Sequence, residues 1–167
     1  MTINHRTTSI ALALVVVGAV TGCTATDAAD GESTATSSSA TTPTTQTSSL
    51  IGEWEMTSLE VGTEGDLSAV PYGGQVIFTD AGTMAVQAAN PDTAAPDGPY
   101  TVNGYEAFYG EVTPVDGDSF TVEVESALAR DLVGQSLARN FEVTGDTLVL
   151  TPTDPAEGFR ATYERQG

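Results

Sequence analysis

The chain has 167 residues, of which 23 are Asp or Glu and only five are Lys or Arg, giving a formal net charge of −18. A surface of this charge repels nucleic acid and anionic lipid headgroups, so we expect no nucleic-acid partner. The only cysteine is Cys23 and the only histidine is His5, and there is no lysine. These absences exclude an internal disulfide, a zinc site built from His and Cys, and a Schiff-base lysine, and we expect no cofactor and no metal.

Residues 1–22 have the parts of a secretory signal peptide. Arg6 stands in a polar start without acids, residues 10–20 (IALALVVVGAV) form a short apolar core, and small residues lead to Cys23. The apolar run is well short of the ~20 residues that span a bilayer, so a transmembrane anchor is not expected. Cleavage would also remove His5, which excludes a Ser-His-Asp triad from the mature protein.

Residues 23–49 read as a lipidated cysteine followed by a linker. The block V-T-G-C that ends at Cys23 resembles the lipobox of bacterial lipoproteins. The resemblance implies cleavage before Cys23, lipidation of its thiol, and anchoring to the cell membrane on its extracytoplasmic face, as the protein's sole membrane contact. The stretch STATSSSATTPTTQTSS has no large apolar residue to bury, and we expect it to be a disordered spacer. An O-glycosylated stalk is the alternative.

Residues 50–167 have the length and composition of one domain. The stretch contains every Trp, Tyr and Phe of the chain. Three of the 23 acids (Asp27, Asp30 and Glu32) precede it, which leaves 20 acids against four arginines and a net charge of −16. The simplest role of this acidity is solubility, and a cationic ligand or a salty habitat are the alternatives.

The domain reads as eight β-strands without a long helix. Three pairs of strands are separated by turn residues, and a first and a last strand flank them. A meander of eight antiparallel strands closes most simply into an up-and-down β-barrel, and an open sandwich is the alternative. The predicted strands are residues 53–59, 75–79, 83–88, 108–115, 119–125, 135–143, 147–151 and 159–165.

Three segments interrupt this rhythm. Residues 90–99 (NPDTAAPDGP) are expected to form a loop, residues 100–107 a short helix or turn, and residues 127–134 (ALARDLVG) a helical turn. Loops of this length on a barrel can be binding loops or plain connections, and both interpretations stay open here.

The domain resembles the lipocalin-like domain family, small calycin-type barrels of bacteria and fungi. The resemblance begins with the G-x-W of residues 50–54 (LIGEW) and continues in order to the closing residues TYER. It implies a barrel with a cavity for a small apolar molecule and implies no particular reaction. Relatives tend to carry a histidine in the strand matching Thr121–Glu125, which has none here, so no role of that histidine carries over. The other matching segments are LIGEWEMTSLEV, PYGGQVIFTDAGTMAVQ, YEAFYGEV and LVGQSLARNFEVTGDTLVL.

The first and last strands must meet if the barrel closes, which brings Trp54 and Arg165 together. Arg165 shares strand parity with the apolar face of its strand. Lipocalins stack a basic side chain on the G-x-W tryptophan, and the resemblance therefore implies a cation–π contact between these two residues. An ordinary core tryptophan with a frayed terminal arginine is the alternative.

Alternation also predicts which side chains fill the barrel. Arg139 shares a face with Leu137, Phe141 and Val143, so it should point inward, where an unpaired charge is costly. Its partner is either internal (the hydroxyl of a tyrosine such as Tyr105, Tyr109 or Tyr163, or a loop acid) or the carboxylate of a bound ligand; a bulge that turns Arg139 outward is the third possibility. The predicted ligand-binding residues are Arg139, Trp54, Met56, Phe78, Met84, Phe120, Val122, Phe141 and Tyr109, with Val86 and Val124 on the same lining.

Three functions are compatible with this pattern. We expect a binding protein for a small hydrophobic molecule, either neutral or anionic, rather than an enzyme; no protein partner is identified. The alternatives are a structural lipoprotein whose barrel is filled by its own side chains, and an enzyme that uses carboxylates and tyrosines. The acid pairs Glu53/Glu55 and Glu123/Glu125 should face solvent, because they alternate with apolar residues. A cavity of several hundred Å³ would favour binding, and an acid with a raised pKa inside it would favour catalysis.

Overall fold

The computed structural model describes residues 47–63 and 65–167. The predictions for the signal peptide, Cys23 and nearly all of the linker lie outside these residues. The described part begins with the 3₁₀ turn η1 (Thr47–Ser49), and two residues separate this turn from the first strand.

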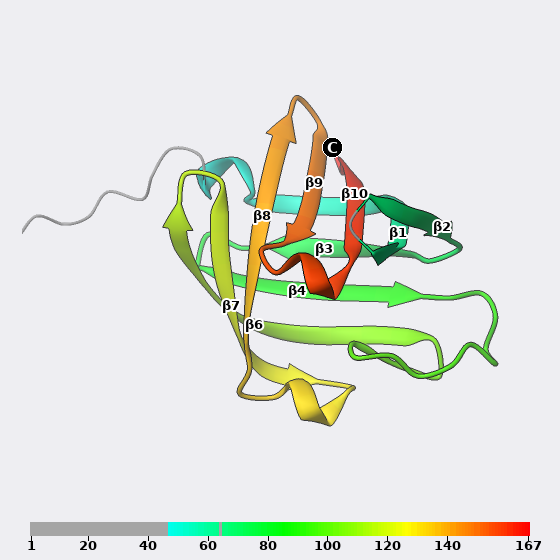
Figure 1. Cartoon of the computed structure of the whole chain (residues 1–167). Helices are drawn as coiled ribbons and strands as arrows, with labels where there is room; N and C mark the ends of the chain where they lie inside the picture. The colour runs from blue at the N-terminus through cyan, green and yellow to red at the C-terminus, as the bar shows by residue number, and fades with distance from the viewer. Residues whose placement is uncertain (1–46, 64) are drawn as a thin grey trace, which may run out of the picture. The chain divides into compact units, whose positions relative to one another are not determined.

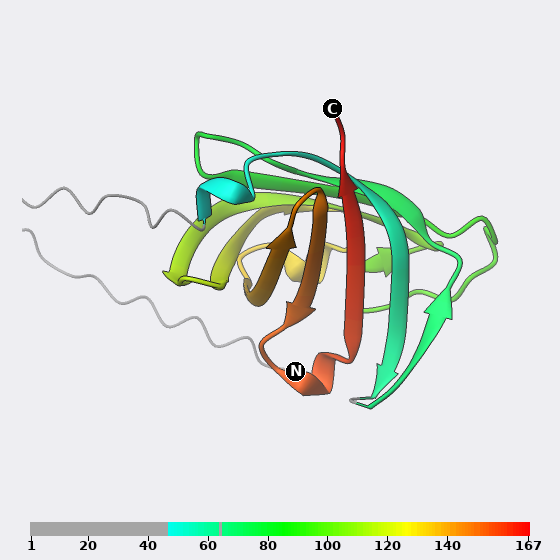
Figure 2. The ribbon, with the colours of Figure 1, turned by 90° about the horizontal axis from the view of Figure 1, so that it is seen from above.

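Eight antiparallel strands close into one barrel, as the sequence predicts. Each barrel strand pairs with its neighbour along the chain, and the last strand pairs with the first. The three predicted hairpins are the pairs β3–β4, β6–β7 and β8–β9. Figure 1 shows β8, β9 and β10 crossing the strands behind them, and Figure 2 shows the ring from above. The barrel strands are β1 (Gly52–Thr63), β3 (Gly73–Phe78), β4 (Thr83–Ala89), β6 (Tyr105–Asp116), β7 (Ser119–Ala127), β8 (Ser136–Thr144), β9 (Thr147–Pro152) and β10 (Phe159–Arg165).

Two short strands lie outside this ring. β2 (Asp66–Val70) pairs with the second half of β1, and β5 (Thr101–Val102) pairs with the start of β6. The expectation of a helix or turn over residues 100–107 is therefore only half right. Asn103 and Gly104 have positive φ angles of 52° and 69° and form a tight hairpin turn, the conformation that Asn-Gly favours between strands.

The remaining connections agree with the sequence or add to it. Residues 90–99 contain no helix or strand, and the predicted helical turn within 127–134 is η2 (Arg130–Leu132). A further 3₁₀ turn, η3 (Pro155–Glu157), joins β9 to β10 and was not predicted.

The predicted contact between Trp54 and Arg165 closes the barrel. The two residues are register partners across β1 and β10, and the guanidinium carbon lies 3.9 Å from the centre of the indole ring, which confirms the cation–π contact. Arg165 also donates to the carbonyls of Ile51 (2.9 Å) and Ser49 (2.7 Å), while the indole N–H donates to Leu50 (2.8 Å). The guanidinium of Arg165 thus links the residues just before β1 to the last strand.

Aromatic side chains fill one part of the barrel. The ring of Phe120 packs edge-on against Phe78 at a centroid distance of 5.6 Å, and it packs in a tilted arrangement against Phe141 at 5.9 Å. Trp54 is completely buried in the same core. Because alternation sends these residues inward, the acids between them face outward, and the acid pairs of β1 and β7 are exposed as predicted.

Candidate functional site

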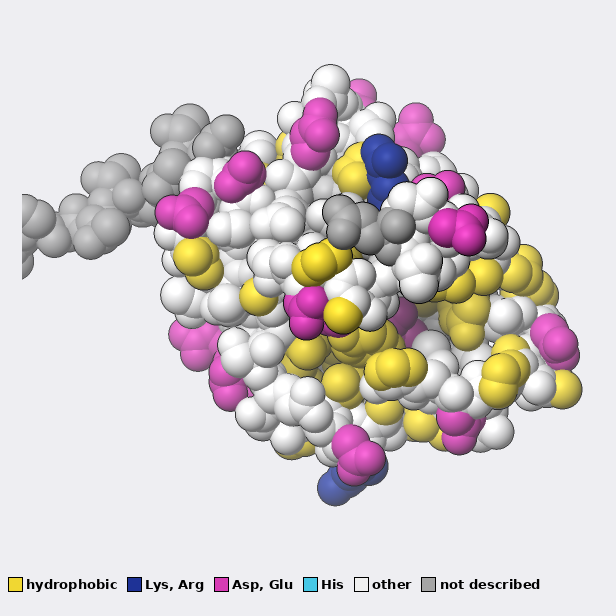
Figure 3. Space-filling model, in the orientation of Figure 1, with side chains coloured by type: hydrophobic (Ala, Val, Ile, Leu, Met, Phe, Trp, Pro, Cys, Tyr) yellow, Lys and Arg dark blue, Asp and Glu magenta, His cyan; other side chains and the backbone are white. Residues whose placement is uncertain are grey.

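An apolar cavity of about 450 Å³ occupies the part of the barrel that the aromatic core leaves open. The side chains of Met56, Met84 and Val86 line it from β1 and β4, and Leu150 and Ala161 line it from β9 and β10. Figure 3 shows hydrophobic side chains gathered in a hollow beside η3. The volume lies within the ~300–1,000 Å³ that small-molecule sites usually have.

Arg139 extends into this cavity from β8 and is 6% exposed. Its guanidinium forms an ion pair with Glu157 at 3.1 Å and donates to the hydroxyl of Tyr100 at 3.2 Å. The guanidinium carbon also lies 5.6 Å from the ring centre of Tyr100 and 5.1 Å from that of Phe159. The inward direction follows from strand alternation, and protein groups supply the partners that a buried cation requires.

Local backbone structure brings Glu157 to this position. The carboxylate of Asp154 caps η3 by accepting from the N–H of Ala156 at 2.9 Å, and Gly158 ends the turn with a φ of 57°. A Cβ on Gly158 would lie 1.8 Å from the carbonyl oxygen of Gly62, so only glycine allows η3 to lie this close to β1. Glu157 thereby stands at the cavity edge beside Arg139.

Tyr100 reaches the same point from the loop between β4 and β5. Its ring packs edge-on against Phe159 at a centroid distance of 6.4 Å, and its hydroxyl donates to Glu157. Burial, followed by the hydrogen bond to Glu157, raises the pKa of Tyr100 above its usual value. The hydroxyl therefore stays protonated at neutral pH, and Arg139, Glu157 and Tyr100 form a satisfied polar triad.

Glu106 is the second acid of the cavity. Alternation along β6 points it inward with Phe108, opposite Ala88 of β4. Burial is the main cause that raises the pKa of Glu106 from 4.5 to about 7, and the charge of Arg139 partly opposes this rise. Near pH 7, the carboxyl of Glu106 is thus present in both charged and neutral forms.

Tyr163 lines the cavity from β10 close to Glu106. Its side chain is buried, and burial together with the charge of Glu106 raises the pKa of Tyr163 well above its usual value. Tyr163 therefore offers a neutral hydroxyl to the cavity at any physiological pH.

All of the sequence-predicted binding residues except Tyr109 fall into three groups. Arg139, Met56 and Met84 line the cavity, together with Val86. A second group is buried in the aromatic core and lies outside the cavity lining: Trp54, Phe78, Phe120, Val122 and Val124. Phe141 is also buried but borders a hollow on the outer surface. A ligand contact for any of these residues stays a prediction.

The expectation that the side chain of Tyr109 lies inside the barrel is wrong. It is 40% exposed on the outer face of β6, because the alternation of that strand turns Phe108 and Gly110 inward. Its hydroxyl donates to Glu125, which raises the pKa of Tyr109. Tyr105 lies on the same outer face at 39% exposure, so the tyrosine that binds Arg139 is Tyr100, which sequence reasoning missed.

A loop acid was among the partners expected for Arg139, and Glu157 confirms that alternative. The sequence analysis named neither Glu157 nor Glu106, for different reasons. Glu106 could have been found by extending the alternation of residues 108–115 backward by one inward position. The position of Glu157 had no signal, because η3 is a loop element whose direction depends on contacts with β1.

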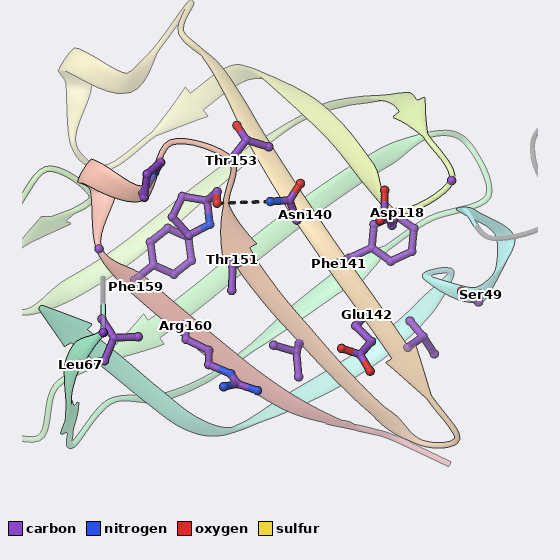
Figure 4. Close-up of a pocket in the computed structure, with 17 residues that line it drawn as sticks. Ser49, Leu67, Asp118, Asn140, Phe141, Glu142, Thr151, Thr153, Phe159 and Arg160 are labelled. Atoms are coloured by element: carbon purple, nitrogen blue, oxygen red, sulfur yellow. Dashed lines mark hydrogen bonds between the residues drawn. The ribbon is translucent and has the colours of Figure 1, made fainter. Parts of the chain in front are cut away.

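A larger hollow of about 950 Å³ lies over the outer faces of β8, β9 and β10. Figure 4 shows its labelled side chains, which include Asn140, Glu142 and Arg160. These three are exposed, and the Asn140 amide donates to the carbonyl of Pro152 at 3.5 Å. A molecule placed there would remain in contact with water, so we take the inner cavity as the candidate site despite its smaller volume.

Comparisons with known proteins do not assign this chain to a family. No protein-family model matches the chain, and no curated protein matches it. An uncharacterized protein from Bacteroides eggerthii aligns at 15% identity over 70% of this chain and 99% of its own, with a TM-score of 0.43. A mutant of the fluorescent protein UnaG aligns at 13% identity over 71% of this chain and 97% of its own, with a TM-score of 0.35. Scores this low carry no argument, so the closed barrel rests on its own strand pairing, and membership of the lipocalin-like family stays a prediction.

The described residues contain neither a metal-binding group of side chains nor a membrane-spanning helix. No group of three or more His, Cys, Asp or Glu side chains in that part of the chain could hold a metal ion. No helix within residues 47–63 and 65–167 is long and apolar enough to cross a membrane.

The raised pKa of Glu106 predicts a pH dependence of stability. Between the unfolded pKa of 4.5 and the folded pKa of about 7, the folded chain keeps a proton that the unfolded chain has lost. This contribution to stability is therefore present at low pH and is lost as the pH rises to about 7. From pH 5.5 to pH 8.5, the wild type should lose about 2 kcal/mol that a Glu106→Gln variant retains, measured by urea unfolding.

Glu111→Gln is the matched control, because it makes the same change on the exposed outer face of the same strand. This variant should keep the pH profile of the wild type. Parallel profiles for wild type and Glu106→Gln would show that the carboxyl is not held in a desolvated position.

Proposed function

We propose that this protein is a lipid-anchored, extracytoplasmic binding protein whose barrel takes up a small hydrophobic molecule. The observation that carries the proposal is the apolar cavity of about 450 Å³ inside a barrel whose other part is filled by aromatic side chains. A structural barrel filled by its own side chains would leave no such space. Burial of an apolar molecule against this lining is favourable at roughly 25 cal/mol per Å² of surface removed from water, before the costs of binding.

The cavity part of the proposal is tested with a neutral fluorescent probe. N-phenyl-1-naphthylamine brightens in apolar surroundings, and we expect it to bind wild-type protein with a saturable increase in emission. Ala161→Phe places a ring in the cavity and should abolish the increase, whereas Thr162→Phe, on the outward face of the same strand, should preserve it. Equal brightening by both variants would place the probe elsewhere and refute the cavity as the site.

The anchoring part of the proposal rests on the sequence alone: the V-T-G-C block and the short apolar core that precedes it. A Cys23→Ser variant has no thiol to lipidate, so the protein should leave the membrane fraction or remain as the uncut precursor. Fractionation of cells followed by immunoblotting checks this. A variant of mature size that stays with the membrane would contradict the lipobox interpretation.

An enzyme is the second candidate, and one observation favours it. Glu106 combines a position in the cavity with a pKa of about 7, which suits a general acid or base. The two functions are separated by incubating the protein with a molecule that binds in the cavity, recovering that molecule and measuring its mass by mass spectrometry. A mass equal to that of the added molecule supports binding, and a different mass supports catalysis.

A further inference from the structure

The polar groups of the cavity differ in whether the protein itself satisfies them. Arg139, Glu157 and Tyr100 bind one another. Among the described residues, the carboxyl of Glu106 and the hydroxyl of Tyr163 have no hydrogen bond to any other protein group, although Tyr163 is buried and Glu106 is half-buried in the cavity lining. Buried polar groups are normally hydrogen-bonded, so these two are the groups of the cavity that await a partner.

The ionisable side chains of the cavity leave an excess of negative charge. Arg139 and Glu157 neutralise each other at 3.1 Å, and Arg139 is further held by Tyr100. Glu106 is then the uncompensated charge of the interior, with Asp97 contributing a second negative charge from the loop at the edge. An anionic ligand would add to this excess, or would have to displace Glu157 from Arg139. A cation would cancel it.

The surroundings of Glu106 fit an amphiphilic molecule. Glu106 lies near the start of β6, where β5 pairs with it through Thr101. Farther along β6 and β4 the inward residues are Phe108, Val86 and Met84, all apolar. A polar head at Glu106 would therefore continue into an apolar tail along these side chains. The domain's net charge of −16 attracts cations toward the barrel from a distance.

We propose that the ligand is a cationic amphiphile, a hydrophobic molecule with a protonated amine, and that the carboxylate of Glu106 is its counter-ion. The inference rests on the proposed binding function and names the chemistry of its ligand. The amine donates to the Glu106 carboxylate, the Tyr163 hydroxyl lies within the same polar end, and the apolar tail lies against Met84 and Val86. Arg139 is in this account a structural cation that holds Glu157 and Tyr100 at the cavity edge.

Three probes with the same dodecyl tail test the sign of the charge. Dodecylamine, dodecanol and dodecanoate compete with N-phenyl-1-naphthylamine at pH 8, below the concentrations at which they aggregate. The protein is the full chain with Cys23→Ser, which carries no lipid. Primary amines titrate near pH ~10, so dodecylamine is charged, and Glu106 is ionised. We expect dodecylamine to compete about tenfold more strongly than dodecanol, and dodecanoate to compete more weakly than dodecanol.

The matched variants assign this preference to one carboxyl. Glu106→Gln keeps the shape and removes the charge, so dodecylamine should lose its advantage over dodecanol. Glu111→Gln removes the same charge from the outer face of β6 and should leave the advantage unchanged, which also excludes nonspecific attraction to an acidic surface. The wild-type ranking is itself a test that needs no variant to fold.

The outcomes separate this inference from the proposed function. If dodecanoate competes best, or if the preference for the amine survives in Glu106→Gln, the ligand chemistry is wrong while the cavity function stands. If the naphthylamine probe binds but no dodecyl compound displaces it, the amphiphile is likewise refuted. If the probe does not bind at all, the proposed function itself fails.

Discussion

A permanent cation inside an apolar barrel is the constraint on which the candidate site depends. Arg139 is 6% exposed, and leaving its guanidinium cation unpaired at this depth would be costly. The fold resolves this by bringing Glu157 from η3 and Tyr100 from the loop after β4 to the same guanidinium. The loop after β4 and the turn η3 are thereby fixed at the edge of the cavity. Their side chains form the polar end of the cavity.

The two arginines of the interior have opposite effects on the space inside the barrel. Arg165 lies on Trp54 and ties together the strands that close the ring, next to a core packed with aromatic rings. Arg139 holds Glu157 and Tyr100 at the edge of the apolar cavity, whose lining includes all three residues. A barrel of eight strands is wide enough either to be filled by side chains or to hold one small molecule. In this chain aromatic side chains fill one part of the barrel, and a cavity remains in the other.

Much of the fold could be predicted because its information is local. Turn residues between alternating segments predict the three hairpins. The pairing of Trp54 with Arg165 follows once the first and last strands meet. The inward direction of Arg139 also follows from alternation. The kind of partner that Arg139 has, a tyrosine hydroxyl and a loop acid, could be predicted. The particular residues could not, because Glu157 and Tyr100 belong to irregular segments positioned by long-range contacts. Glu106 was not predicted as an inward residue because the predicted strand began at residue 108. After the Asn103-Gly104 turn, β6 begins three residues earlier than that.

The two methionines of the described domain, Met56 and Met84, line the cavity from different strands, and they offer a direct test of where a ligand lies. Labelling the methionine methyl groups with ¹³C gives two reporters in the barrel. With dodecylamine bound, nuclear Overhauser contacts from the alkyl protons to both methyl groups are predicted. Saturable binding without contacts to either methyl group would place the ligand outside the barrel, for example in the hollow over β8, β9 and β10, and would contradict the account.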